Sequence, residues 1–462
     1  MKPKYFLALG LLVLGLGSCG ESFFEQYPSN NITEGNFYKT DDDFNQGVVA
    51  CYAKLKTQMS FHLTEIGYRG DENVLESMAV STQNRYDIDH FAETANNGIL
   101  NDIWNAWYNG IYRCNDVLDH MTGAKIANYD KYRGECLFLR SWWYFNLYRV
   151  FGVVPITRTV VTPAAAKLIP RCTEEEMYTL LTEDLAEAAR LLPPTPGPEK
   201  ARVANIAAYT LLAKVYLTFG KPGEAKTALE EAMKNTSYGL ESTTKKVFDV
   251  GNKMNREIIF ALYYNKANDT GHGYWYSTTK PEEAQLTQPA PVFRALYDAR
   301  DNRLPLISEY TEDKKGTYLL NKWFDNRNDA LKGNVVENDF PHLHYADVVL
   351  MYAEALAESG GSLDDALVWL NKTRVRAGLD ELTTDEVKSL AEFRRELADE
   401  RGREFALEGH RWFDLVRLGL AVDYFRGLGY SLDAHNLIFP IPQSQIEIVN
   451  NPSILWQNPG FN

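Results

Sequence analysis

Hydrophobic residues recur every three or four positions along much of the chain, which is the spacing of one face of an α-helix. This pattern predicts amphipathic helices in residues 44–55, 104–115 and 174–192. Residues 134–151 are apolar on almost every side, so they predict a helix that is buried all round. Gly152 and Pro155 follow directly and are expected to end that helix.

Two segments share one order of features: a helix, a glycine turn, and a second helix that opens with an acid and an alanine. The first turn is at Gly220, followed by Glu224-Ala225, and the second is at Gly360-Gly361, followed by Asp365-Ala366. This order is typical of tetratricopeptide repeats, whose period is ~34 residues. Ser362 and Asp365 have the spacing of a helix-capping box. Helix pairs are therefore expected around 44–120, 137–192, 203–235 and 344–377.

Residues 236–342 interrupt this rhythm with a composition rich in Asn, Tyr, Thr, Pro and Gly. A long irregular segment in a compact protein is usually functional or disordered, and the aromatic content here argues against disorder. The predicted fold is mostly α, a tetratricopeptide-like helical-repeat superhelix without a large sheet. It carries one long irregular, loop-rich insertion.

The first residues have the features of a lipoprotein signal peptide. Lys2 and Lys4 precede an apolar run, Tyr5 to Leu16, that is shorter than the ~20 residues a membrane-spanning helix needs. The run ends in the lipobox Leu16-Gly17-Ser18-Cys19. Residues 1–18 are therefore predicted to be removed and Cys19 to be acylated; several acyl chains, at ~0.8 kcal/mol per buried CH₂, would anchor it stably. The alternative is an ordinary signal peptide with an incidental cysteine.

The charge balance excludes one class of partner. The chain has 62 acidic and 48 basic residues and a net charge of -14, whereas nucleic-acid-binding surfaces need basic patches. The remaining cysteines, Cys51, Cys114, Cys136 and Cys172, form no C-x-x-C pair, so a zinc site is not expected. The first three are predicted to be small core residues, although a disulfide stays open in an exported protein.

The sequence lacks the motifs of the common hydrolase and phosphate-binding sites, such as H-E-x-x-H, G-x-S-x-G and G-x-x-x-x-G-K-[ST]. We therefore expect no enzymatic activity and no cofactor. His342 and His344 could suggest a metal pair but have no evident partner ligands. Asp41-Asp42-Asp43 suits the N-terminus of a helix, and a structural calcium ion there is the weaker alternative.

The stretch from Glu400 to Gly419 mixes charges with aromatic residues in an unusual way. It predicts a half-buried helix whose ions are paired, with i,i+4 pairs of Arg395 with Asp399 and of Asp399 with Arg403. His410, Arg411 and Asp414 are interpreted as structural. The alternative is an active site built from these groups, and structural ion-pair networks are the commoner case.

The same stretch closely resembles the C-terminal signature of the SusD/RagB family, the nutrient-binding lipoproteins of two-membraned bacteria. Four further segments resemble that family: Gly134 to Phe145, Leu343 to Ala355, Asn371 to Leu379, and Gln457 to Phe461. His344 stands where the family usually has arginine. The resemblance covers essentially the whole mature chain, and the matched motifs are scaffold motifs that do not carry the identity of a ligand.

The resemblance implies a SusD-like α/α fold with an N-terminal region, 19–240, and a C-terminal region, 241–462, that includes a ligand segment, 265–342. It implies a lipid-anchored protein of the outer-membrane surface that sits over a SusC-like TonB-dependent transporter. Such a protein captures oligosaccharides and releases them inward without catalysis. A peptide-binding member of the family is the alternative, and a surface glycosidase is a third reading.

A sugar ring has one apolar face and a rim of hydroxyls, so its site needs flat aromatic side chains with polar groups beside them, on loops that leave the scaffold. Two stretches fit this description. One carries Tyr274, Trp275, Tyr276 and, further along, Trp323; the other carries Asp71, Arg85 and Tyr86. The position of the second stretch also resembles where family members place polar ligand contacts. We expect Trp275 to be the platform and Asp71 and Arg85 to bind hydroxyls; the alternative is that Trp275 packs under its own loop.

Overall fold

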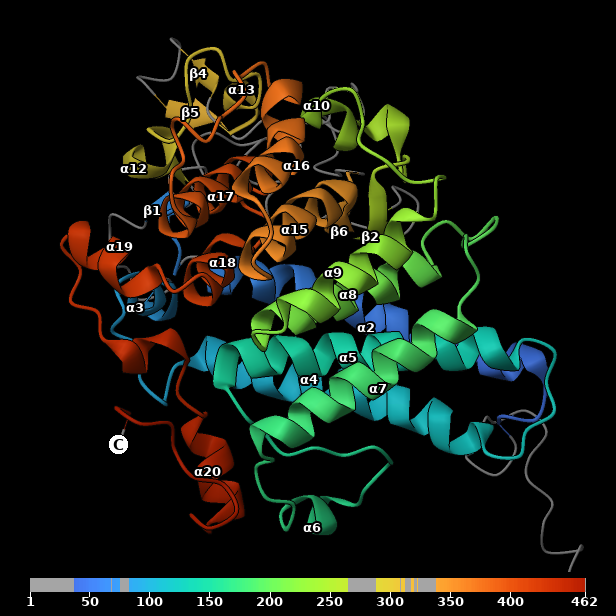
Figure 1. The fold of residues 1–462 in the computed structure, drawn as a ribbon. Helices are drawn as coiled ribbons and strands as arrows, with labels where there is room; N and C mark the ends of the chain where they lie inside the picture. The colour runs from blue at the N-terminus through green and yellow to red at the C-terminus, as the bar shows by residue number, and fades with distance from the viewer. Residues whose placement is uncertain are drawn as a thin grey trace, which may run out of the picture.

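The computed structural model describes residues 37–67, 69–74, 83–264, 288–307, 309–311, 317–319, 322 and 338–461. Within these residues most of the chain is α-helical, and consecutive helices lie antiparallel beside one another (Figure 1). The predicted mostly α fold is confirmed.

In the described part of the chain, nine long helices form one continuous stack in which each helix packs on the next. They are α2 (Asp41–Gly67), α4 (Gly98–Met121), α5 (Tyr129–Phe151), α7 (Glu174–Leu191), α8 (Asn205–Thr218), α9 (Pro222–Met233), α15 (Tyr345–Glu358), α16 (Leu363–Arg376) and α17 (Leu390–Glu404). The stack passes directly from α9 to α15, so the described residues between them form an insertion at its side (Figure 1). The four expected helix pairs correspond to α2 with α4, α5 with α7, α8 with α9, and α15 with α16.

Side-chain caps and glycine turns form the ends of several of these helices. Thr173 and Glu176 form a capping box at the start of α7, and the hydroxyl of Ser362 accepts a hydrogen bond from the Asp365 N–H at the start of α16. The turns at Gly220 and Gly360 have positive φ angles of 67° and 82°, which glycine adopts without steric cost. The repeat of helix, glycine turn and helix is therefore built as predicted.

The carboxylates of Asp41 and Asp43 at the start of α2 accept hydrogen bonds from nearby N–H groups. The carboxylate of Asp43 accepts from the backbone N–H groups of Lys39 and Thr40 at 3.0 and 2.7 Å. The carboxylate of Asp41 accepts from the backbone and side-chain amides of Asn128 at 2.9 and 2.8 Å. These contacts confirm the helix-terminus interpretation, and the calcium alternative stays untested.

The core is centred on α5, which is buried on nearly all sides, as its sequence predicts. The ring of Trp143 is fully buried and lies 6.5 Å from that of Trp107 on α4. Gly110 on α4 faces the same indole, because a Cβ atom there would come within 2.2 Å of Trp143 Cε2. The absence of a side chain at Gly110 thus lets α4 and α5 approach closely around one large ring.

The shorter elements surround this stack. The helices are α3 (Gln83–Asp89), α6 (Pro163–Ala166), α10 (Thr244–Val247), α12 (Pro291–Arg294), α13 (Leu304–Ile307), α18 (Arg411–Arg417), α19 (Ala421–Gly427), α20 (Gln443–Val449) and the 3₁₀ turns η2 (Val250–Asn252) and η5 (Ala434–Leu437). The strands are β1 (Asn73–Val74), β2 (Ile258–Leu262), β3 (Gln288–Pro289), β4 (Glu309–Thr311), β5 (Thr317–Leu319) and β6 (Phe340–His344). Among the described residues they form three two-stranded antiparallel sheets, β1–β3, β2–β6 and β4–β5.

The C-terminal segment packs back on the N-terminal half. The Phe439 N–H donates to the Val150 carbonyl at 2.8 Å, and the Asn458 side-chain amide donates to the Phe151 carbonyl at 2.9 Å. Arg171 donates to the Asn458 side chain at 2.7 Å. The end of α5 is therefore completed by residues from the last part of the chain, across the predicted boundary at residue 240, which itself stays a prediction.

The cysteines within the described residues, Cys51, Cys114, Cys136 and Cys172, are buried free thiols. The prediction that the first three fill the core is confirmed. None of the helices in the described part of the chain combines the length and the apolarity needed to cross a membrane.

Candidate functional site

One short sheet pairs the early ligand-binding stretch with residues that follow Trp275 in the sequence. β1 (Asn73–Val74) follows Asp71, and it pairs antiparallel with β3 (Gln288–Pro289), which closes the segment that carries Trp275. The Ala290 N–H also donates to the Glu72 carbonyl at 3.1 Å. The structure therefore joins residues 72–74 to residues 288–290, although they are far apart in the sequence.

Asp71 lies in the core and not on a surface that a ligand can reach. Its side chain is fully buried, and its two carboxylate oxygens accept hydrogen bonds from Arg411 Nε and Nη2 at 2.9 and 3.1 Å. The Tyr424 hydroxyl donates to the second oxygen. The prediction that Asp71 binds a sugar hydroxyl conflicts with this geometry, because both oxygens already compensate a buried guanidinium.

Arg85 and Tyr86 lie on α3 and are half-buried. The Tyr86 ring stacks on His90, with ring centroids 3.8 Å apart and an interplanar angle of 17°. A ring nitrogen of His90 lies 3.0 Å from the Tyr86 carbonyl oxygen, which fixes the stack one helical turn apart. Tyr86 is thus held as a pre-oriented aromatic surface beside the start of α4.

The other predicted site residues lie outside the described residues. They are the lipidation site Cys19 and the ligand contacts Tyr274, Trp275, Tyr276 and Trp323. Their roles stay predictions.

The signature stretch is a buried ion-pair network, as the structural interpretation of His410, Arg411 and Asp414 predicts. All three side chains are buried. The Asp414 carboxylate accepts from Arg401 Nε at 2.8 Å and from Arg417 Nη2 at 2.9 Å. Each charge in this stretch faces a partner in the scaffold, which accounts for the mixture of ionic and aromatic residues.

The expected i,i+4 pairs of this stretch are wrong. Asp399 pairs with Arg411 at 3.3 Å and not with Arg395 or Arg403. Arg403 instead pairs with Glu400, three residues earlier, at 3.1 Å. Asp399 takes its partner from another helix, because the packing of α18 on α17 brings Arg411 within ion-pair distance.

One buried cluster has the residue types of a metal site. Donor atoms of Glu257, His344 and Glu404 lie within 4.8 Å of one another. Arg376, however, donates to both oxygens of Glu257, at 2.9 and 2.7 Å, and also to Glu404. Burial favours a neutral ring, but the carboxylates of Glu408 and Glu257 outweigh it and raise the pKa of His344 to about 9. The cluster is built as an ion-pair network, because Arg376 pairs with Glu257 and Glu404 and His344 lies within ion-pair distance of Glu257 and Glu408.

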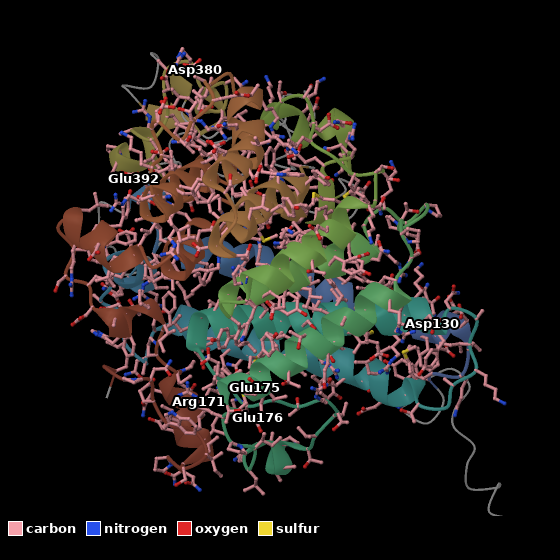
Figure 2. The ribbon with its side chains drawn as sticks, in the orientation of Figure 1. Asp130, Arg171, Glu175, Glu176, Asp380 and Glu392 are labelled. Carbon is pink, nitrogen blue, oxygen red and sulfur yellow. The ribbon has the colours of Figure 1, made fainter. Side chains whose placement is uncertain are left out.

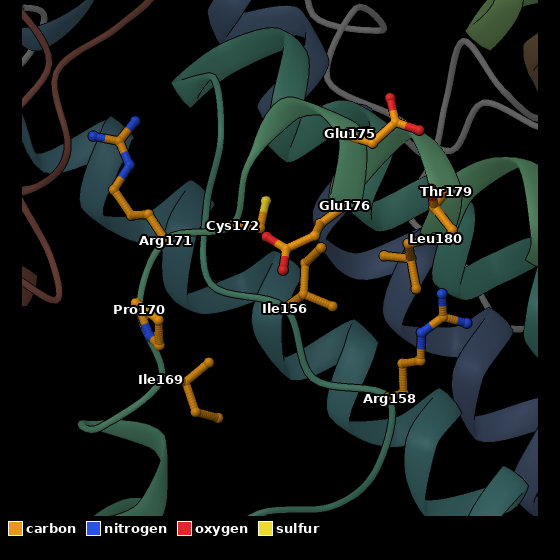
Figure 3. A pocket seen from close by; sticks show the side chains of 10 residues that line it. All are labelled: Ile156, Arg158, Ile169, Pro170, Arg171, Cys172, Glu175, Glu176, Thr179 and Leu180. Atoms are coloured by element: carbon orange, nitrogen blue, oxygen red, sulfur yellow. The ribbon is translucent and has the colours of Figure 1, made fainter.

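Two hollows flank the segment between α5 and α7. The first has a volume of about 470 Å³ and lies beside the first turns of α7 (Figure 3). Figure 2 places Arg171, Glu175 and Glu176 in this part of the molecule. Arg171 points away from the hollow and donates to the carbonyls of Val153 and Trp456, while Glu176 caps α7 through Thr173 (Figure 3). None of its lining residues, all within the described ranges, is aromatic, so it does not offer a flat platform.

The second hollow, of about 360 Å³, is the α4–α20 pocket, between α4, α6 and α20. Trp104, Tyr108 and Tyr112 line it at i, i+4 and i+8 of α4, so their rings share one face of that helix. Trp104 and Tyr108 are 5.0 Å apart between ring centroids, and the ring of Tyr112 is 42% exposed. The side-chain amides of Asn105 and Gln445 form a polar rim at 3.2 Å from each other.

Sequence reasoning missed this pocket. The spacing of Trp104, Tyr108 and Tyr112 was a sufficient signal for an aromatic helix face, but an aromatic stripe at helical spacing is more often core. Only the positions of α6 and α20, which the spacing does not contain, leave part of this face open.

Two family models match separate parts of the chain. The model described as "SusD family" matches residues 301–461, and the model described as "Starch-binding associating with outer membrane" matches residues 27–217. Together they include α4, α5, α15 and the signature stretch.

Single relatives are similar over the full length. SusD-like protein P2 of Formosa agariphila is 25% identical and matches 99% of this chain and 100% of its own. Among solved structures, a laminarin-binding SusD-like protein is 25% identical with a TM-score of 0.76, covering 92% of this chain and 100% of that one. Surface glycan-binding protein A of Bacteroides thetaiotaomicron, solved with laminarihexaose, has the same fold at 20% identity and a TM-score of 0.76, covering 91% of this chain and 99% of that one.

Proposed function

The chain belongs to the SusD/RagB family, and on that premise we propose that it is a cell-surface protein that binds oligosaccharides and passes them to a SusC-like TonB-dependent transporter without catalysis. The observation that carries the proposal is the full-length similarity to a laminarin-binding protein. This relative has the same fold, is 25% identical and is described as binding laminarin, so it indicates the class of ligand.

The proposed ligand site is the region of the β1–β3 sheet. Tyr274, Trp275, Tyr276 and Trp323 would supply the aromatic platforms, and Arg85 and Tyr86 the adjoining polar and aromatic contacts. The pairing of β1 with β3 supports this arrangement, because it joins residues 73–74, which precede α3 in the chain, to residues 288–289, which follow Trp275 in the sequence. The pre-oriented stack of Tyr86 on His90 offers a ring at a low cost in side-chain entropy.

We expect the purified mature chain to bind a neutral oligosaccharide saturably in isothermal titration calorimetry, with laminarihexaose and maltohexaose as first probes. Trp275→Ala should weaken binding by about tenfold, since one lost aromatic contact is worth ~1 kcal/mol beyond its buried area. Tyr112→Ala, in the α4–α20 pocket, is the matched control and should leave affinity unchanged.

Three results would contradict this assignment. Saturable binding of peptides, with no binding of any glycan in the same titrations, would favour the peptide-binding alternative. A loss of affinity in Tyr112→Ala but not in Trp275→Ala would move the site to the α4–α20 pocket. Turnover of an oligosaccharide by the purified protein would establish a glycosidase.

The proposed location at the outer membrane rests on Cys19. Cys19→Ala should give a protein without acyl chains that leaves the membrane fraction in cells lacking the transporter, because the acyl chains are the proposed anchor. Mass spectrometry and cell fractionation measure both effects, and gentle detergent extraction of the wild type should co-purify the transporter. An unlipidated variant that still sediments with membranes would exclude this anchor.

A further inference from the structure

A cluster of buried and half-buried charges, which includes Arg401, Asp414 and Arg417 of the signature stretch, contains more cations than carboxylates. Within the described residues it contains four cations, Arg149, Lys214, Arg401 and Arg417, and three carboxylates, Asp347, Glu354 and Asp414. The last three cations hold all three carboxylates. Lys214 and Arg401 pair with Asp347, Arg401 and Arg417 pair with Asp414, and Arg417 also pairs with Glu354. Burial lowers the pKa of His410, beside them, well below its usual value, so it adds no charge.

Arg149 is the cation without a carboxylate among the described residues. Its guanidinium donates to the side-chain oxygen of Asn146 and lies over the rings of Phe413 and Phe145, 4.0 and 4.7 Å from their centroids. Its buried Nε has no hydrogen-bond partner in the described part of the chain. Arg149 is half-buried, and an unpaired guanidinium that is partly removed from water costs free energy. This burial lowers the pKa of Arg149 to about 9.

Arg149 lines a pocket of about 300 Å³ together with Lys214, Arg417 and Thr218. This volume is at the lower end of the range for small-ligand sites. The Asp414 carboxylate also lines the pocket, but its oxygens are already held by Arg401 and Arg417. The pocket therefore presents excess positive charge between two aromatic rings, with one guanidinium edge unused.

We propose that this pocket binds the carboxylate of a small organic ligand, with Arg149 as its main contact. A planar guanidinium fork matches a carboxylate, and a single negative charge restores the balance of the group. Two sources supply this chemistry, the carboxylate of an acidic sugar and the C-terminus of a peptide. The site is separate from the β1–β3 region and does not depend on where neutral oligosaccharides bind.

The test titrates the full mature chain with D-glucuronate and with N-acetylglycine, at constant ionic strength because salt screens charge. D-glucose and N-acetylglycine amide are the uncharged counterparts. At least one carboxylate should bind saturably and raise the melting temperature, because a ligand of the native state stabilises it. The tighter of the two identifies the source.

Arg149→Gln, which removes the charge, should weaken carboxylate binding at least tenfold, and Arg149→Lys, which keeps the charge but loses the fork, should weaken it severalfold. Arg158→Gln is the matched control, because Arg158 is an exposed arginine that lines the hollow beside the first turns of α7. If Arg149→Gln does not fold, the melting temperature of the wild type still tests the proposal, because the carboxylates should raise it and their uncharged counterparts should not. Equal responses to the carboxylates and their uncharged counterparts, or unchanged affinity in Arg149→Gln, would overturn the proposal.

Discussion

Replacing Trp143 with alanine should lower the free energy of unfolding by about 3–5 kcal/mol, the range for large aromatic truncations in cores. Trp143 is fully buried in α5 and packs on Trp107 of α4. Gly110 lies directly against the same indole. Because α4 and α5 approach each other around this ring, the remaining cavity cannot close without moving a whole helix. Urea denaturation followed by circular dichroism measures the effect.

Trp456→Ala is the matched control, since it removes the same side chain from a site that is 41% exposed. The Cζ atom of Arg171 lies 4.8 Å from the ring centroid of Trp456. A cation–π contact at an exposed site is worth about 0.5–1 kcal/mol. The loss there should be the smaller of the two by a wide margin. Equal losses in both variants would show that Trp143 is not a centre of packing.

Arg411→Met should destabilise the protein by about 3–5 kcal/mol, the usual cost of removing one member of a buried ion pair. Arg411 holds both oxygens of Asp71, and it also donates to the Ala398 carbonyl at 2.7 Å. Without it the Asp71 carboxylate is left buried, with the Tyr424 hydroxyl as its remaining donor. Denaturation by urea at pH 7 gives the change.

A double-mutant cycle separates the pair from its surroundings. Asp71→Asn with Arg411→Met should be less destabilising than the sum of the single variants, because the second change removes the charge that the first leaves unpaired. Oligosaccharide affinity, measured on folded protein, should not change in either single variant. A variant of full stability with lost ligand binding would instead make Arg411 a ligand contact.

The sequence predicts the scaffold well because its signals are local. Helical spacing, the turns at Gly220 and Gly360 and the cap at Ser362 each concern residues within a few positions of one another, and all appear in the structure. The sequence also predicts that α5 is buried, because this segment is apolar on nearly every side, and the structure confirms it.

The predictions that failed concern partners far away in the chain. Asp71 occurs in a polar stretch and reads as a surface residue, yet its partners come from α18 and α19. Asp399 has basic residues at helical spacing on both sides, yet it pairs with Arg411. Local spacing gives the charges that are available, and only the packed arrangement decides which of them meet.

The return of the C-terminal segment to α5 has a consequence for the order in which the chain can fold. The carbonyls of Val150 and Phe151 receive their partners from Phe439 and Asn458, so the N-terminal helices remain incomplete until nearly the whole polypeptide has been synthesised. Closing such long loops is slow compared with forming helix pairs. If the chain is exported N-terminus first, as the proposed signal peptide implies, its N-terminal helices cannot complete their packing during translocation. Cooperative folding of the whole domain then has to wait for the last residues.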